Sequence, residues 1–189
     1  MMNYSKFCEL VDWKNCRKGI FHNKELLRKD TPKFSYKSHV KLLPQFFLEF
    51  IEPDETPYRI FFYLCEPFSE TVTISVNETT SRTIDFSQTS QAKTVKKFIT
   101  SLATLDLVAI RRGRLAYRGW DKEENKPIFE QKKVDILLGL DIAHLTYNKL
   151  VDRILIFSYD VDLQPALKIA RMGGLQIILL TRNLSRQRI

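Results

Sequence analysis

Five aspartates stand where an α/β sheet would bring them together: Asp12, Asp135, Asp141, Asp160 and Asp162. Asp12 ends the apolar run at residues 7–11. Asp160 and Asp162 closely follow the apolar run at residues 154–157. An open α/β sheet binds ligands outside the carboxyl ends of its strands. Carboxylate oxygens at that edge suit a hard divalent cation such as Mg²⁺ or Mn²⁺. The sequence therefore predicts a metal site there.

Asp141 falls on the apolar side of a helix predicted over residues 134–150. With Asp135 set to zero and about 100° per residue, the apolar side chains fill an arc from roughly 200° to 340°, and Asp141 lies near 240°. Burying a lone carboxylate is costly unless it is ion-paired, hydrogen-bonded or metal-bound. We therefore favour a ligand role for Asp141, and a salt bridge or hydrogen bond within the core is the alternative.

The other acids have structural alternatives of their own. Asp135 and Asp162 stand at predicted helix starts, where aspartate is favoured as a cap or first-turn residue. Asp160, closer to the strand end, is harder to explain as a cap. Asp12 has a turn-forming alternative, and Asn15 could hold that loop or hydrogen-bond a carboxylate. Each assignment alone is weak evidence. The expectation that all five acids lie close together is what indicates a metal site.

The acids stand out because the chain as a whole is basic, with a net charge of +8 and a pI near 9.4. A positive excess favours nucleic acid or an anionic membrane surface as a partner. Cations near the acids could hold phosphates, although a solvated surface role is the alternative for each: Lys14, Lys132, Lys133, Arg111, Arg112 and Arg114. Trp13 and Tyr159 could stack bases, as aromatic side chains do in single-strand binders.

The elements that must position these residues alternate between strand and helix. Strands are predicted at residues 7–11, 58–65, 107–117, 154–157 and 175–180, and helices at 35–51, 91–105, 134–150 and 162–172. Such alternation with short links predicts an α/β fold with a parallel sheet. Residues 111–114 are expected to form a tight basic turn, and Pro44 to kink or split its helix. Residues 66–91, rich in Ser and Thr, are expected to be an insertion that forms a hairpin or a substrate-facing loop.

Several classes of protein are excluded or disfavoured. An odd number of cysteines without C-x-x-C spacing indicates reduced thiols and a cytoplasmic protein. The absence of a signal peptide and of a long apolar run argues against a membrane protein. There is no G-x-G-x-x-G motif and no P-loop, which disfavours the usual nucleotide cofactors. The D-x-D at residues 160–162 is also found in haloacid-dehalogenase-type phosphatases, but too little chain follows it here for that fold.

The acids belong to a longer pattern. Residues 132–141 follow K-x-V-D-x-x-L-x-x-D, and residues 158–163 follow S-G-D-x-D-F except at Tyr159 and Leu163. In these segments the chain resembles the NYN family of PIN-like nuclease domains, which includes the LabA-type bacterial proteins. Further matches are the opening D-x-x-N at residues 12–15, a G-x-L strand at 113–115 and a Pro-Ala-Leu helix start at 165–167.

The resemblance implies one PIN-like domain over residues 1–189: a three-layer α-β-α sandwich whose central parallel sheet has strand order 3-2-1-4-5. It implies catalysis and metal binding by Asp12, Asp141, Asp160 and Asp162, with Asp135 as a further metal ligand and Asn15 in support. The implied reaction is hydrolysis of a phosphodiester by water activated on Mg²⁺ or Mn²⁺. RNA, preferably single-stranded, is the expected substrate, and another nucleic acid stays open.

Two departures from the family pattern lead to rival hypotheses. Tyr159 stands where glycine is usual, and Trp13 stands where a small residue is common. Either side chain could crowd the site, so the rival is a catalytically weak or inactive module of the same fold that binds nucleic acid or protein. A third hypothesis is a nuclease effector or toxin held in check by a regulatory protein, and a homodimer also stays open.

Overall fold

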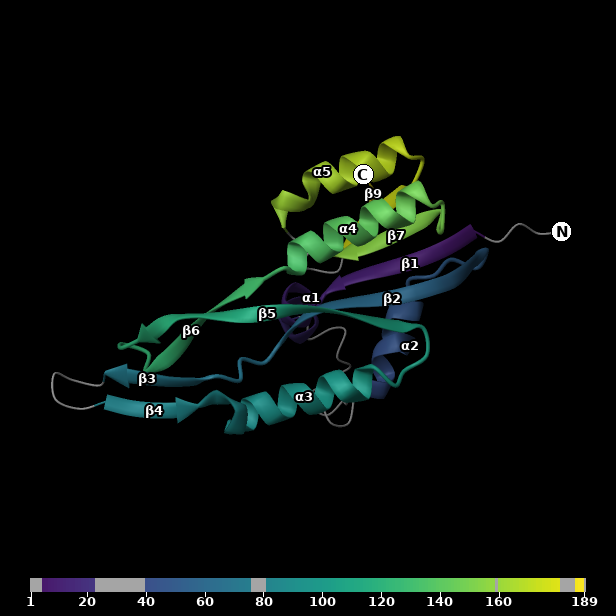
Figure 1. Ribbon diagram of the computed structural model, residues 1–189. Coiled ribbons are helices and arrows are strands. Elements are labelled where there is room, and N and C mark those ends of the chain that lie inside the picture. Colours follow the sequence, from purple (N-terminus) through teal and green to yellow (C-terminus); the bar gives the residue numbers. More distant parts are fainter. Residues whose placement is uncertain (1–4, 23–39, 76–80, 159, 181–185, 189) are drawn as a thin grey trace.

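The computed structural model of the chain describes residues 5–22, 40–75, 81–158, 160–180 and 186–188 (Figure 1). Across these residues a seven-stranded sheet forms in the order β6-β5-β2-β1-β7-β8-β9. Its strands are β1 (Ser5–Asp12), β2 (Glu55–Glu66), β5 (Val108–Asp121), β6 (Lys126–Lys132), β7 (Arg153–Phe157), β8 (Gln176–Leu180) and β9 (Arg186–Arg188). The fold is therefore α/β, as the alternation of elements predicted.

The sheet is mostly parallel. Strands β5, β2, β1, β7 and β8 run parallel to their neighbours, and the two edge strands β6 and β9 run antiparallel. Counted in chain order, the five parallel strands lie in the sequence 3-2-1-4-5 across the sheet. The order reverses between β1 and β7, so the carboxyl ends of these two adjacent strands flank the point where a ligand crevice forms in open α/β sheets.

Helices cover both faces of the sheet (Figure 1). The longer helices are α1 (Trp13–His22), α2 (Leu43–Leu48), α3 (Ser90–Leu102), α4 (Val134–Tyr147) and α5 (Gln164–Met172). On one face, Val11 packs in a core that includes side chains of α1, α2 and α3. On the other face, Leu10 packs in a core that includes side chains of α4 and α5. Because both faces of β1 are buried, its sequence is a nearly continuous apolar run.

The expected insertion at residues 66–91 contains an antiparallel hairpin of β3 (Thr71–Ser75) and β4 (Ser81–Asp85). The hairpin and the long β5–β6 ribbon project from the same side of the molecule (Figure 1). Phe68 and Phe86, which flank the hairpin, pack against Tyr117 and Phe129 of the ribbon, with ring centroids 5.3 to 6.2 Å apart. This aromatic cluster attaches the hairpin to the ribbon.

The basic turn predicted at residues 111–114 is wrong, because these residues lie inside the continuous strand β5. Gly113 has a different role from that of a turn glycine. A Cβ on this residue would lie 2.7 Å from the Lys132 carbonyl oxygen and 2.8 Å from Cγ2 of Val134. Its missing side chain therefore lets the end of β6 and the start of α4 approach β5 closely.

The helix predicted over residues 35–51 is shorter in the structure. A 3-10 turn (Val40–Leu42) precedes α2, and residues 35–39 lie outside the described part of the chain. Pro44 falls in the first turn of α2. Proline is tolerated there because its missing N–H would have no partner within the helix.

Arg153 joins the two strands that flank β1. It begins β7, its guanidinium lies 4.8 Å from the ring centroid of Phe7 on β1, and it forms ion pairs with Glu55 of β2 and with Glu52. The side chains of Arg153 and Glu55 are only 4% and 5% exposed. This buried pair holds the amino-terminal edge of the sheet together.

None of the helices in the described ranges is both long and apolar enough to cross a membrane. Cys8, Cys16 and Cys65 are buried free thiols, as their number and spacing predicted.

Candidate active site at the carboxyl ends of β1 and β7

Asp12 is the most buried of the five acids, with 4% of its surface exposed. It is the last residue of β1, and its carboxylate accepts hydrogen bonds from the backbone N–H groups of Lys14 (3.1 Å) and Asn15 (3.3 Å) and from the Asn15 side-chain amide (2.7 Å). Burial raises its pKa, the hydrogen bonds from Asn15 and Lys14 lower it, and the negative charge of Asp135 raises it. Asn15 thus both shapes the turn and supports the carboxylate.

Asp160 follows β7 and caps the short 3-10 helix η3 (Val161–Leu163). Its carboxylate accepts a hydrogen bond of 2.9 Å from the backbone N–H of Asp162, and its own N–H donates to Ser158 Oγ at 3.3 Å. Sequence analysis found a capping role harder to explain for Asp160 than for Asp162, and that expectation was wrong, although Asp162 does lie in the first turn of η3, one of the positions predicted for it. The extended backbone of Asp160 allows its side chain to reach the first turn, while Asp162 is exposed.

Asp135 lies in the first turn of α4, one of the two positions predicted for it. The cap position belongs to Lys133, which has a left-handed backbone with φ of 76° and makes no capping hydrogen bond through its side chain. Partial burial raises the pKa of Asp135, and the negative charges of Asp160 and Asp162 raise it further. An acid in the first turn is favoured by the helix dipole, so the dipole offsets part of this repulsion.

These interactions join acids from three separate elements. Asp135 on α4 interacts electrostatically with Asp12 at the end of β1 and with Asp160 and Asp162 after β7. Because β1 and β7 are adjacent and parallel, their carboxyl ends lie side by side. The structure therefore brings four of the five predicted acids into one electrostatically coupled cluster, called here the strand-end acids: Asp12, Asp135, Asp160 and Asp162.

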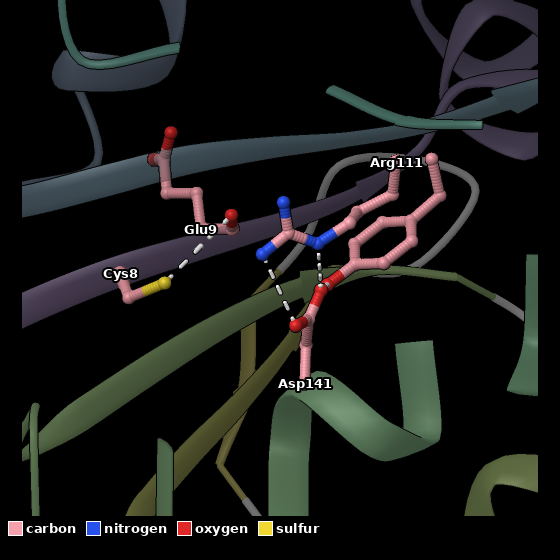
Figure 2. A network of polar contacts seen from close by, with 5 residues as sticks. Cys8, Glu9, Arg111 and Asp141 are labelled. Atoms are coloured by element: carbon pink, nitrogen blue, oxygen red, sulfur yellow. Dashed lines mark hydrogen bonds and ion pairs between the residues drawn. The ribbon is translucent and has the colours of Figure 1, made fainter. Parts of the chain in front are cut away.

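Asp141 is held by a different set of partners (Figure 2). Arg111 donates to both of its oxygens, from Nε at 2.7 Å and from a terminal nitrogen at 3.2 Å, and the Tyr63 hydroxyl donates at 2.8 Å. The side chain is 15% exposed. The ligand role that we favoured for Asp141 is thus replaced by its alternative, a salt bridge and a hydrogen bond, because the carboxylate is already neutralised and hydrogen-bonded.

Tyr63 is the residue of this network that sequence reasoning missed. It is fully buried within the apolar strand β2, and burial followed by the charge of Asp141 raises the pKa of its hydroxyl far above the usual range. The available signal was a hydroxyl inside the otherwise apolar run at residues 60–65 of β2, since a buried tyrosine normally finds a hydrogen-bond partner.

The cations predicted to bind nucleic acid divide into two groups. Arg111 is paired with Asp141, Arg112 with Glu66 and Lys132 with Glu130. The other three are exposed: Lys14, Lys133 and Arg114. Arg111 in particular forms its ion pair with Asp141 of α4, so it is not part of a row of surface cations that could bind phosphates.

The two aromatic residues predicted to stack bases also differ. Trp13 is 7% exposed and stacks on Phe98 of α3, with ring centroids 5.1 Å apart, while its edge contacts Phe62. It is chiefly a core residue. Tyr159 lies outside the described residues.

The side chains of the strand-end acids offer only oxygen atoms as metal ligands. The Asn15 side chain is hydrogen-bonded to one of these acids, Asp12. Oxygen donors in small number fit Mg²⁺ and Mn²⁺, which keep several water ligands of their own. Within residues 5–22, 40–75, 81–158, 160–180 and 186–188, no three His, Cys, Asp or Glu side chains lie close enough together to hold a metal ion as they stand. The chemistry of the donor set therefore fits such a cation, and binding would require the acids to draw together.

Comparison with family models, with curated proteins and with solved structures finds no match to this chain. The resemblance to the NYN family thus rests on the sequence motifs alone and stays a prediction.

Proposed function

We propose that the chain is a PIN-like, metal-dependent nuclease of the cytoplasm that hydrolyses phosphodiester bonds, with single-stranded RNA as the favoured substrate. The observation that carries the proposal is the electrostatic interaction of Asp135 both with Asp12 at the end of β1 and with Asp160 after β7. Carboxylates that repel one another and are partly buried are stabilised by a bound cation, since desolvation and like charge both disfavour their ionised forms. Their place beside the order reversal between β1 and β7 and the 3-2-1-4-5 order of the parallel strands also support it.

Asp12, Asp135, Asp160 and Asp162 are the residues that would hold the cation, with Asn15 fixing the orientation of Asp12. Bound Mg²⁺ or Mn²⁺ supplies Lewis acidity and lowers the pKa of a bound water. Lys14 and Lys133 adjoin these acids in the chain and are exposed, so they are suited to hold the phosphates of the substrate. Asp141 contributes indirectly, because its contacts with Arg111 and Tyr63 fix α4, the helix that carries Asp135.

The test is cleavage of labelled single-stranded RNA by the full chain with Mn²⁺ or Mg²⁺. We expect Asp12→Asn and Asp160→Asn each to lower the cleavage rate by at least about 100-fold, since even supporting residues of metal sites contribute 10- to 100-fold. Asp106→Asn is the matched control, because Asp106 is an exposed aspartate in the turn before β5. Equal rates for the three variants and the natural chain would reject the nuclease function.

The second candidate is a module of the same fold that binds nucleic acid without cutting it. The observation that favours it is that, in the described part of the chain, no three potential ligands are assembled. Direct binding of Mn²⁺, measured by calorimetry, separates the candidates. A nuclease binds the ion and loses that binding in Asp12→Asn, whereas a non-catalytic module binds RNA equally well with and without Mn²⁺.

A further inference from the structure

A cavity of about 510 Å³ opens between the β3–β4 hairpin, α3 and the β5–β6 ribbon. Its volume falls within the range of small-molecule sites, roughly 300 to 1,000 Å³. The aromatic cluster that attaches the hairpin to the ribbon contributes Phe68, Phe86 and Phe129 to its wall. The cavity thus arises where the insertion meets the sheet, and part of its wall, including Trp13, Leu64 and Phe98, belongs to the core on the α1–α3 face.

Much of the wall is aliphatic, with Leu64, Ile84 and Val95 among its residues, and three further kinds of side chain join them. Aromatic rings offer flat faces, and Trp120 of the ribbon adds an indole to those of the cluster. Lys14, Arg17 and Arg82 bring positive charge, while Gln91 and Gln131 bring amides that can both donate and accept hydrogen bonds. Flat aromatic faces with nearby cations and amides are the features that bind an unpaired base and its phosphate. A site for a purely apolar ligand would need neither the cations nor the amides.

The cavity reaches the residues that directly follow Asp12, although none of the strand-end acids lines it. Trp13 and Lys14, which directly follow Asp12, both line it. Cys65 also lines it, and the charges of both Lys14 and Asp12 reach that thiol. A ligand in the cavity would therefore lie within electrostatic reach of Asp12.

We propose that this cavity binds one unpaired nucleobase of a single-stranded nucleic acid, with Lys14 and Arg82 attracting the attached phosphates. The inference rests on the proposed function for its class of substrate, and it assigns the insertion a role in binding that substrate. Base recognition by this cavity would produce a preference for single strands, because a base in a duplex is stacked and cannot enter.

The test uses intrinsic tryptophan fluorescence, since the only two tryptophans of the sequence, Trp13 and Trp120, both line the cavity. The full chain is titrated in EDTA with AMP, GMP, CMP and UMP, and with ribose 5-phosphate as the control that lacks a base. After correction for nucleotide absorbance, we expect saturable quenching by the nucleotides and none by ribose 5-phosphate. Because EDTA removes divalent cations, this measurement does not depend on cleavage.

Thr94→Phe is designed to fill the cavity from α3, and Thr100→Phe is its matched control. Both residues lie on α3, but Thr94 lines the cavity and Thr100 is exposed elsewhere. We expect Thr94→Phe to weaken nucleotide binding by at least about 10-fold, the scale of losing one base stack, and Thr100→Phe to leave it unchanged. Circular dichroism of both variants verifies that they are folded.

Three results would overturn the inference: quenching by ribose 5-phosphate equal to that by nucleotides, no nucleotide response by fluorescence or calorimetry, or equal nucleotide affinity in the two threonine variants. Failure of the nuclease function is distinguishable, because it leaves nucleotide binding in EDTA intact. Conversely, RNA cleavage that persists without nucleotide binding in EDTA rejects the base-binding site alone.

Discussion

Two aspartates on the same helix, Asp135 and Asp141, lie in opposite electrostatic environments. Asp135 lies near other acids, and partial burial together with the charges of Asp160 and Asp162 raises its pKa. Asp141 receives two hydrogen bonds from a guanidinium and one from a phenol. Both side chains looked like ligands in the sequence. The difference teaches that the surrounding charges, and not the residue type or its helical angle, separate a carboxylate available to a cation from one already neutralised.

The strongest test of this comparison is Asp141→Asn. Removing the charge weakens two charge-assisted hydrogen bonds from Arg111, and we expect the free energy of unfolding to fall by about 2 kcal/mol. Arg111 is 35% exposed, so water compensates part of the lost ion pair. Urea denaturation of the variant beside Asp106→Asn measures the effect. Unchanged stability would mean that Asp141 is not a structural residue.

Glu9 provides a third kind of carboxylate: it is buried, and within the described part of the chain its side-chain oxygens have no hydrogen-bond partner. It lies on β1 and points away from the Arg111–Asp141 pair (Figure 2). Burial raises its pKa well above the ordinary value. The native state therefore keeps the proton that the unfolded chain releases, and stability falls as the pH rises from the unfolded pKa toward the folded one.

We expect this loss to approach about 1.4 kcal/mol per pH unit in that interval. Glu9→Gln, which cannot ionise, should match the natural chain in acid and exceed it in stability at neutral pH. Chemical denaturation at a series of pH values measures the difference. A constant difference between the two chains at every pH would show that Glu9 does not titrate between the native and unfolded states.

Tyr63→Phe removes the neutral donor from Asp141 and leaves its ion pair with Arg111. We expect a loss of stability of about 1 kcal/mol, the net value of one hydrogen bond. Tyr58→Phe is a control on the same strand, because Tyr58 is half-buried at the amino-terminal part of β2. An equal loss of stability in both variants would show that the hydrogen bond from Tyr63 to Asp141 does not stabilise the fold.

The smallest effect is expected for Asp135→Asn. Relief of repulsion from Asp12 and Asp160 should raise stability by a few tenths of a kcal/mol, on the order of a surface charge interaction. Added Mn²⁺ should stabilise the natural chain more than this variant, because ligand binding to the native state raises its stability. Thermal melts with and without Mn²⁺ measure both effects, and a variant less stable than the natural chain without metal would contradict the repulsion.

The fold was largely predictable from sequence, because buried parallel strands and amphipathic helices leave strong patterns. The apolar run at residues 7–11 and the helix predicted over residues 162–172 are examples, because β1 ends at Asp12, directly after that run, and α5 ends at Met172. Arg111 shows the limit. Its place in a basic run predicted an exposed turn, whereas its partner lies on a helix that follows later in the chain. Local sequence patterns do not report such long-range pairs.

The candidate site was predictable in part. The positions of Asp12 and Asp160 at adjacent strand ends followed from the topology of an open sheet. The capping role of Asp160 depended on its backbone angles, and the cavity depended on how Phe68 and Phe86 pack against the ribbon. Those features arise from packing between distant segments, which a single sequence does not encode in any local signal.

The buried ion pair of Arg153 with Glu55 has a mechanical consequence for the sheet. The pair connects β7 to β2 across β1 at the amino-terminal edge of the sheet. At the opposite edge, the strand-end acids repel one another. Local opening is easiest where contacts are weakest, so β1 and β7 should fray from their carboxyl ends. A divalent cation bound there would connect the carboxyl ends of β1 and β7. Amide hydrogen exchange at Val11 and Phe157 should therefore slow when the cation binds.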